Sequence, residues 1–312
     1  MPQESQQIVL SRGLTDSVKF LAATAVAMCH FSADALEVAE NPIYRFFATH
    51  GGSVGVALFF FLSGYGLMMS DRRKHLSFLE FVKRRLVRVY LPVVFVTAVW
   101  GIVVWPAGDG VAHLPEYLYS VFWTFSDGIL WFVKAILLLY LFFYAYSTVR
   151  LRISPVLRLL ALIVGTAVAY YLVYHLFAGY CAISVPFFAL GVVLVEFNEK
   201  VYAVCHSYKL VLWLVGITAI LGACYLAWGN LYAHALGNWY LVTMLVALCA
   251  WRQIDFSLPV WVGGCSYDIY LTHHKVQKFL QPIYGNIPLH HFLVGVVICV
   301  AASYSLRKLL RI

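Results

Sequence analysis

Charged residues are scarce in this sequence: only 12% of its 312 residues are Asp, Glu, Lys or Arg, whereas ordinary soluble domains hold about 25%. Hydrophobic residues make up 62% instead, which is more apolar surface than a water-soluble core of this length can bury. Lipid is the solvent that suits such a chain. The composition therefore excludes an ordinary soluble protein and predicts a membrane lipid bilayer as its surroundings.

The sequence also lacks any Cys-x-x-Cys pair. Its seven cysteines are odd in number and scattered, a pattern typical neither of a structural zinc site nor of a disulfide framework. We therefore expect small core residues at these positions and no metal. Internal repeats and low-complexity tracts are missing too, and with them the inverted-repeat signature common in secondary transporters.

The net charge of +8 does not indicate a nucleic-acid partner, because the basic residues cluster in short segments between apolar runs. That distribution is typical of membrane proteins whose cytoplasmic loops are positively charged. The apolar stretch after Lys19 ends in Ala33-Asp34-Ala35, which could mimic a signal-peptide cleavage site. A multi-span protein needs no cleavable signal, so we expect this segment to stay in the membrane.

Bilayer crossings take about 20 mostly apolar residues each, which predicts an all-α bundle of about ten spans. The basic loops fall on one side, so both termini are expected in the cytoplasm. No loop is long enough for a second domain, so residues 1–312 are expected to form one transmembrane domain. The spans are predicted near 16–35, 52–69, 88–105, 128–147, 155–175, 180–197, 208–227, 235–251, 257–277 and 287–306.

The first predicted span carries Lys19 and His30, eleven residues apart. Eleven steps of 100° return to nearly the same angle, so both side chains share one face, roughly 16 Å apart along the axis. Histidine is well suited to take a proton from a hydroxyl near neutral pH. Asp34, one turn later, would orient the imidazole. The alternative is a structural histidine, with Lys19 as an interfacial anchor.

Three further segments hold polar or charged side chains that could serve a site. Ser63 and Tyr65 lie in a glycine-rich run that either packs closely against another helix or lines a tunnel. Arg84, Arg85 and Arg88 precede Pro92 and form either ordinary cytoplasmic charge or a phosphate clamp. Near the C-terminus, Ser266, Tyr270 and His273 form one helical stripe, with Tyr267 beside it, which argues for a cavity wall.

In their order, these segments resemble the integral-membrane acyltransferase 3 family. Lys19 and His30 fit its basic residue, ten-residue gap and histidine. The runs FFFLSGY, RRLVRVYLP, LWFV around Trp131 and SYDIYLTH follow in the family's order over roughly residues 14–275.

The resemblance implies an acyltransferase of the bacterial inner membrane. It would move acetyl or another short acyl group from acetyl-CoA (acyl-CoA) to a hydroxyl of a cell-envelope or exported polysaccharide or lipid-linked glycan. It further implies that His30 is the essential histidine and Lys19 its basic partner, with the Arg84–Arg88 segment at coenzyme A and Trp131 at the cavity. The rival class is a transporter or flippase of a glycan or lipid, and oligomeric state is not readable from the sequence.

Overall fold

The computed structural model describes residues 10–34, 41–104, 131–177, 179–205, 217, 231–252, 256–259 and 264–310. These residues form helices and no strand, which confirms the all-α prediction for the described part of the chain. In chain order the helices are α1 (Arg12–Asp34), α2 (Pro42–Phe46), η2 (Phe47–Gly51), α3 (Gly52–Arg73), α4 (Phe78–Arg85), η3 (Leu86–Tyr90), α5 (Leu91–Val104), α7 (Trp131–Val149), η8 (Arg150–Arg152), α8 (Pro155–Leu176), α9 (Gly179–Ala182), α10 (Val185–Glu196), α11 (Asn198–Cys205), α13 (Leu231–Arg252), α15 (Ser266–Tyr284) and α16 (Leu289–Leu310).

Among the described residues, three helical segments are long and apolar enough to cross a membrane: Pro42–Arg73, Trp131–Arg152 and Pro155–Leu176. Shorter apolar helices cover Val185–Glu196, His234–Cys249 and Leu289–Ser305. Apart from residue 217, the predicted span at 208–227 lies outside the described residues. The count of about ten spans and the cytoplasmic termini therefore stay predictions.

The predicted span at 257–277 was placed too early, because α15 begins at Ser266. Residues 256–259 are not helical, and Pro259 lacks the amide hydrogen that a helix interior needs. The backbone N–H of Leu258 instead donates to Ser17 Oγ on α1 at 2.7 Å. This contact ties the segment before α15 to the first helix.

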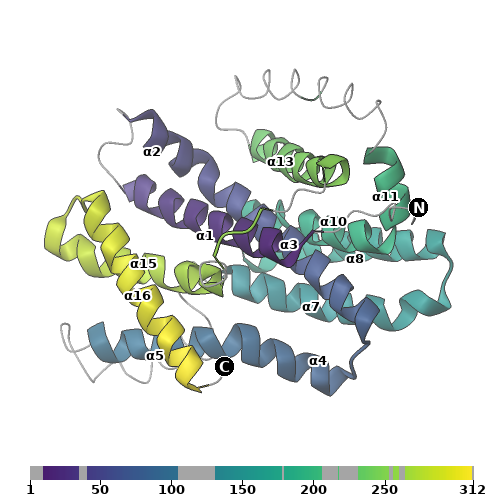
Figure 1. The fold of residues 1–312 in the computed structure, drawn as a ribbon, viewed down its shortest axis with the longest axis horizontal. Coiled ribbons are helices and arrows are strands. Elements are labelled where there is room, and N and C mark those ends of the chain that lie inside the picture. The colour runs from purple at the N-terminus through teal and green to yellow at the C-terminus, as the bar shows by residue number, and fades with distance from the viewer. Residues whose placement is uncertain are drawn as a thin grey trace.

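The centre of the bundle depends on glycines that let helix backbones touch. Figure 1 shows α13 on one side of the molecule and α4 and α5 on the other, with α1, α3, α7 and α10 between them. A Cβ on Gly55 of α3 would lie 2.5 Å from the carbonyl oxygen of Ala22 on α1. A Cβ on Gly64 would collide with the carbonyl of Phe188 on α10, and Gly191 of α10 meets the α3 backbone in the same way. Small residues are what permits such close helix approach.

Helix α8 lies at the periphery, with only 11% of its most apolar window buried. Large apolar side chains such as Val156, Ile163 and Val164 are exposed along it. Exposed apolar surface of this extent is costly in water but not in lipid. Helix α8 therefore suits a lipid-facing position.

Buried charges join the ends of four helical segments. Arg150 of η8 lies 3.1 Å from Asp71 of α3 and 3.2 Å from Glu196 of α10. Arg158 of α8 lies 2.8 Å from the other carboxylate oxygen of Glu196. The Glu196 side chain is only 1% exposed, and the two arginines balance its charge. Glu196 therefore stabilises the packing of the helices at this end of the bundle.

Candidate functional site

Helix α1 carries Lys19 and His30 into two different cavities. Lys19 lines one of them and His30 the other. Eleven residues of α-helix set the two positions about 16 Å apart along the axis. Lys19 Nζ lies 3.4 Å from Asp16 Oδ1, one turn earlier on the same helix. The face of α1 that Lys19 and His30 are predicted to share therefore borders both cavities.

The first cavity has a volume of about 570 Å³, and we call it the basic cavity. It lies between α1, α3, α7, α15 and the segment from α4 to α5. Among the described residues, three cationic side chains line it, together with hydroxyl groups and the carboxylate of Asp16. Its polar lining includes Lys19, Ser63, Arg85, Arg88, Ser266 and Tyr267.

Arg85 packs against two aromatic rings at this cavity. Its guanidinium carbon lies 5.3 Å from the ring centroid of Phe81 and 5.4 Å from that of Tyr140. Within the described part of the chain no carboxylate pairs with it, and its buried Nε has no hydrogen-bond partner. Burial lowers the pKa of Arg85; Tyr140 opposes this effect, and the charges of Arg88 and Arg84 add to it. A cation in this position favours a bound anion.

The spacing of four residues between Arg84 and Arg88 predicts one shared face of an α-helix, but Arg84 is exposed and does not line the basic cavity that Arg88 lines. Helix α4 starts at a capping box in which Ser77 Oγ accepts from the Glu80 N–H. It ends at Arg85, where the π-helical turn η3 begins. A π turn holds more residues than an α turn, so the α-helical spacing used for the prediction does not carry past Arg85. Contact between Arg84 and a ligand stays a prediction.

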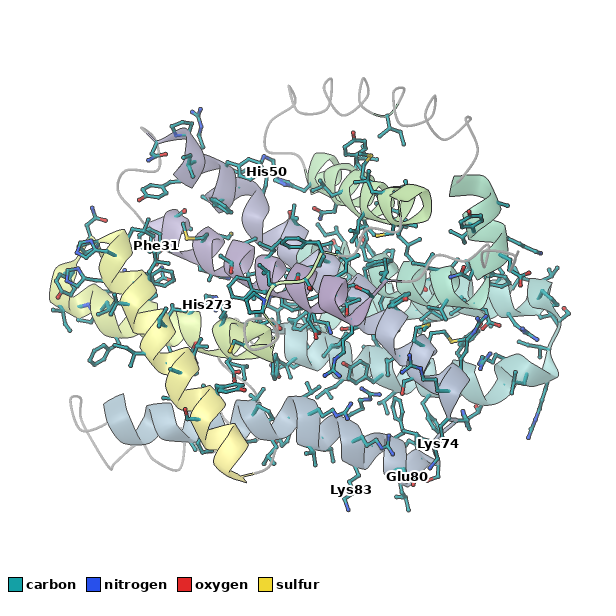
Figure 2. All side chains as sticks on the ribbon, viewed as in Figure 1. Phe31, His50, Lys74, Glu80, Lys83 and His273 are labelled. Carbon is teal, nitrogen blue, oxygen red and sulfur yellow. The ribbon has the colours of Figure 1, made fainter. Side chains whose placement is uncertain are left out.

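The second cavity has a volume of about 270 Å³, and we call it the histidine cavity. The His30 ring packs against two further imidazoles of α15, with centroid distances of 5.3 Å to His273 and 5.9 Å to His274. Figure 2 marks His273 on α15 beside α1. The cavity lining includes Cys29, His30, Ser53, Trp131, His234 and Tyr270.

The protonation pattern of His273 follows from its surroundings. Its Nδ1 lies 2.9 Å from the carbonyl oxygen of Ile269. A carbonyl oxygen only accepts, so Nδ1 carries the hydrogen and Nε2 of the neutral ring carries the lone pair. The side chain is 0% exposed, and Nε2 has no hydrogen-bond partner in the described structure. A buried acceptor thus lies next to His30 with its hydrogen-bonding capacity unused.

The two cavities share a wall. Phe132, the second residue of α7, lines both of them. A cationic cavity and an imidazole cavity joined at one residue have the groups needed to bind an anionic donor and to move a proton during group transfer. Within the described residues, no group of three or more His, Cys, Asp or Glu side chains is arranged to hold a metal ion.

The acyltransferase domain family matches residues 15–308 of this chain. The chain belongs to this acyltransferase family. The match covers nearly the whole sequence and confirms the resemblance seen in its motifs. Together with the apolar helices, it indicates a membrane acyltransferase. No curated protein and no solved structure matches the chain.

Most of the side chains expected at the cavities of this acyltransferase do line them. Ser63, Ser266 and Tyr267 line the basic cavity, and Trp131 and Tyr270 line the histidine cavity. The Tyr267 hydroxyl donates to the carbonyl oxygen of Val89 in η3 at 2.7 Å. The polar stripe of α15 therefore runs from one cavity to the other, as a helical period of 3.6 residues predicts.

Two side chains of the acyltransferase are placed differently from the prediction. Tyr65 lines neither cavity; its hydroxyl accepts a hydrogen bond from the backbone N–H of Leu10 at 2.9 Å. Tyr65 therefore fixes the segment before α1. His273 also lines neither cavity, and its ring packs against the ring of His30. In both cases the polarity of one helix does not reveal which of its faces meets the neighbouring helix.

Asp34 has a partner on another helix of the acyltransferase. Its Oδ2 accepts a hydrogen bond from Gln277 Nε2 at 2.6 Å, and the same nitrogen lies 2.9 Å from the backbone oxygen of His30. Gln277 of α15 thereby holds the end of α1 in place. The predicted role of Asp34 in orienting the His30 ring stays a prediction.

Sequence reasoning missed several residues around the acyltransferase cavities, among them Phe132, His234, His274 and Gln277. His274 and Gln277 lie on the same helix as the predicted stripe, so their spacing was a usable signal. His234 comes from α13, far along the chain, and its ring lies 5.0 Å from that of His50. No local pattern points to that pair.

Proposed function

We propose that this membrane acyltransferase moves an acetyl or other short acyl group from cytoplasmic acyl-CoA to a hydroxyl of a cell-envelope or exported polysaccharide, in a bacterial inner membrane. One observation carries the proposal: a single helix places Lys19 in a cationic cavity and His30 in a separate imidazole cavity. The donor and the acceptor would then reach the reaction from different cavities.

The basic cavity suits the phosphate-bearing end of acyl-CoA. Arg85 and Arg88 offer planar guanidinium groups, which match phosphate oxygens, and Lys19 adds a point charge. At about 570 Å³ the cavity is within the range of small-molecule sites. The acyl end of the donor would extend from there toward His30.

His30 would act as the general base. Its imidazole takes the proton from the acceptor hydroxyl while the oxygen attacks the thioester carbonyl. The carbon–sulfur bond then breaks, the acyl group becomes an ester, and the proton passes from the imidazolium to the departing thiolate. A positioned base of this kind contributes about 10²- to 10⁴-fold to a rate. An acyl-imidazole on His30 is the alternative route, and it would be seen as acyl label on the denatured protein.

A fractionation experiment tests the proposed reaction and finds the acceptor. Membranes from cells that express the wild-type protein or His30→Ala are given acetyl-CoA labelled in its acetyl group. The label is then followed into polysaccharide, lipid-linked glycan and small-molecule fractions. We expect base-labile label in a glycan fraction with wild type only. Label that enters no fraction above the His30→Ala background would contradict the proposal.

A further inference from the structure

Three aromatic rings from three helices separate the basic cavity from the histidine cavity. Phe59 of α3 lines the basic cavity, Tyr270 of α15 lines the histidine cavity, and Phe132 of α7 lines both. The ring centroids lie 5.7 Å apart for Phe59 and Phe132, and 5.3 Å apart for Phe132 and Tyr270. The remaining pair, Phe59 and Tyr270, lies at 6.3 Å. Each ring therefore contacts the other two, and we call the three the aromatic partition.

The aromatic partition is closed in this structure. Phe132 is 6% exposed and Tyr270 is 3% exposed. The ring of Phe60, which is fully buried, supports Phe132 from behind with a centroid distance of 5.0 Å. Side chains packed in this way leave little empty space between them. An acyl group can pass between the cavities only if at least one ring moves.

We propose that the aromatic partition makes the enzyme selective for short acyl groups, and that Phe132 is the residue that sets the limit. This inference rests on the proposed function. Phe132 is the ring of the partition that lines both cavities, so an acyl group meets it from either side. Forcing extra methylene groups into a packed site displaces side chains from their preferred rotamers. The cost therefore rises with every carbon beyond acetyl.

The selectivity is tested with a series of acyl-CoA donors from acetyl to octanoyl. Phe132→Ala should raise the ratio of the hexanoyl to the acetyl transfer rate by about ten-fold or more, and Phe132→Leu by less. Phe132→Trp should lower the ratio. Phe187→Ala is the matched control, because Phe187 is fully buried on α10 but lines neither cavity. An unchanged ratio in folded Phe132→Ala and Phe132→Leu would overturn the proposal, as would an equal rise in Phe187→Ala.

A second readout does not depend on catalysis. Cys29 lines the histidine cavity, so a charged thiol reagent can report which side of the membrane reaches it. The protein, with its other cysteines replaced, is reconstituted in liposomes and the reagent is added to each side in turn. With Phe132 present we expect Cys29 to react from one side only, and with Phe132→Ala from both. Reaction from both sides with Phe132 in place would overturn the closed partition.

The two readouts separate this inference from the function on which it rests. If the wild type labels from one side but transfers no acyl group from any donor, the proposed function and the chain-length role both fail, while the closed partition stands. If the wild type transfers acetyl but the ratio does not respond to Phe132, only the selectivity fails.

Discussion

At the scale of single residues, Arg85 and Arg84 are neighbours in sequence but differ in surroundings. Arg85 lines the basic cavity between two aromatic rings, and Arg84 is exposed. We predict that Arg85→Ala weakens coenzyme A binding by about ten- to hundred-fold, because a hydrogen bond to a charged group contributes about 1.5–3 kcal/mol. Arg84→Ala should change it by less than about three-fold. Calorimetric titration of both variants with coenzyme A in detergent measures the two affinities. Equal losses of affinity would contradict a binding role that Arg85 has and Arg84 lacks.

We expect His273 to be a positioning residue, because its ring packs against that of His30 and lines neither cavity. Its Nε2 lone pair would stabilise the imidazolium that His30 becomes. We predict that His273→Leu lowers kcat about ten-fold, which is less than the roughly 10²- to 10⁴-fold effect of a general base itself, and leaves KM for acyl-CoA unchanged. His273→Gln, whose amide oxygen can accept a hydrogen bond, should retain more activity. A rise in KM with unchanged kcat would show a donor-binding role instead.

At the scale of elements, the contact between α3 and α10 depends on Gly64, whose Cβ would collide with the Phe188 carbonyl. We predict that Gly64→Ala destabilises the protein by about 1–3 kcal/mol, since overpacking has that cost. Gly66 is the matched control on the same helix, because nothing lies within 4 Å of its added Cβ. Gly66→Ala should leave the thermal unfolding midpoint nearly unchanged. Equal midpoints for both variants would show that α3 and α10 are not packed this closely.

The buried charges at Glu196 join α3, η8, α8 and α10. Removing one partner of a buried ion pair leaves an uncompensated charge and costs about 3–5 kcal/mol. We therefore predict a clear fall in the unfolding midpoint for Glu196→Ala, with coenzyme A binding retained once the protein is folded. Glu199→Ala, at an exposed position on α11, is the control. A midpoint that matches this control would contradict the structural role of Glu196.

At the scale of the whole molecule, the sequence predicts the positions of site residues well where the spacing along a single helix is sufficient. The spacing of Lys19 and His30, and the stripe from Ser266 to Tyr270, need only the 3.6-residue period. The side chains of Tyr65 and His273 line neither cavity for a shared reason. In a membrane protein apolar residues surround each helix, so hydrophobicity does not mark the face that meets a neighbour.

Phe132 could not have been found in this way. Its role follows from α3, α7 and α15 meeting at one point, and those contacts join residues far apart in the chain. The start of α15 and the π turn after Arg85 are likewise set by local backbone geometry that periodicity does not record.

The most direct measurement uses the purified protein in lipid nanodiscs with acetyl-CoA and the acceptor found by fractionation. Loss of the thioester is followed for wild type and for His30→Ala, after coenzyme A binding has been measured for both. We predict that wild type consumes the thioester and that His30→Ala binds coenzyme A equally well but reacts at least about 10²-fold more slowly. Equal rates for the two proteins, or a wild type that neither binds nor consumes the donor, would contradict acyl transfer at His30.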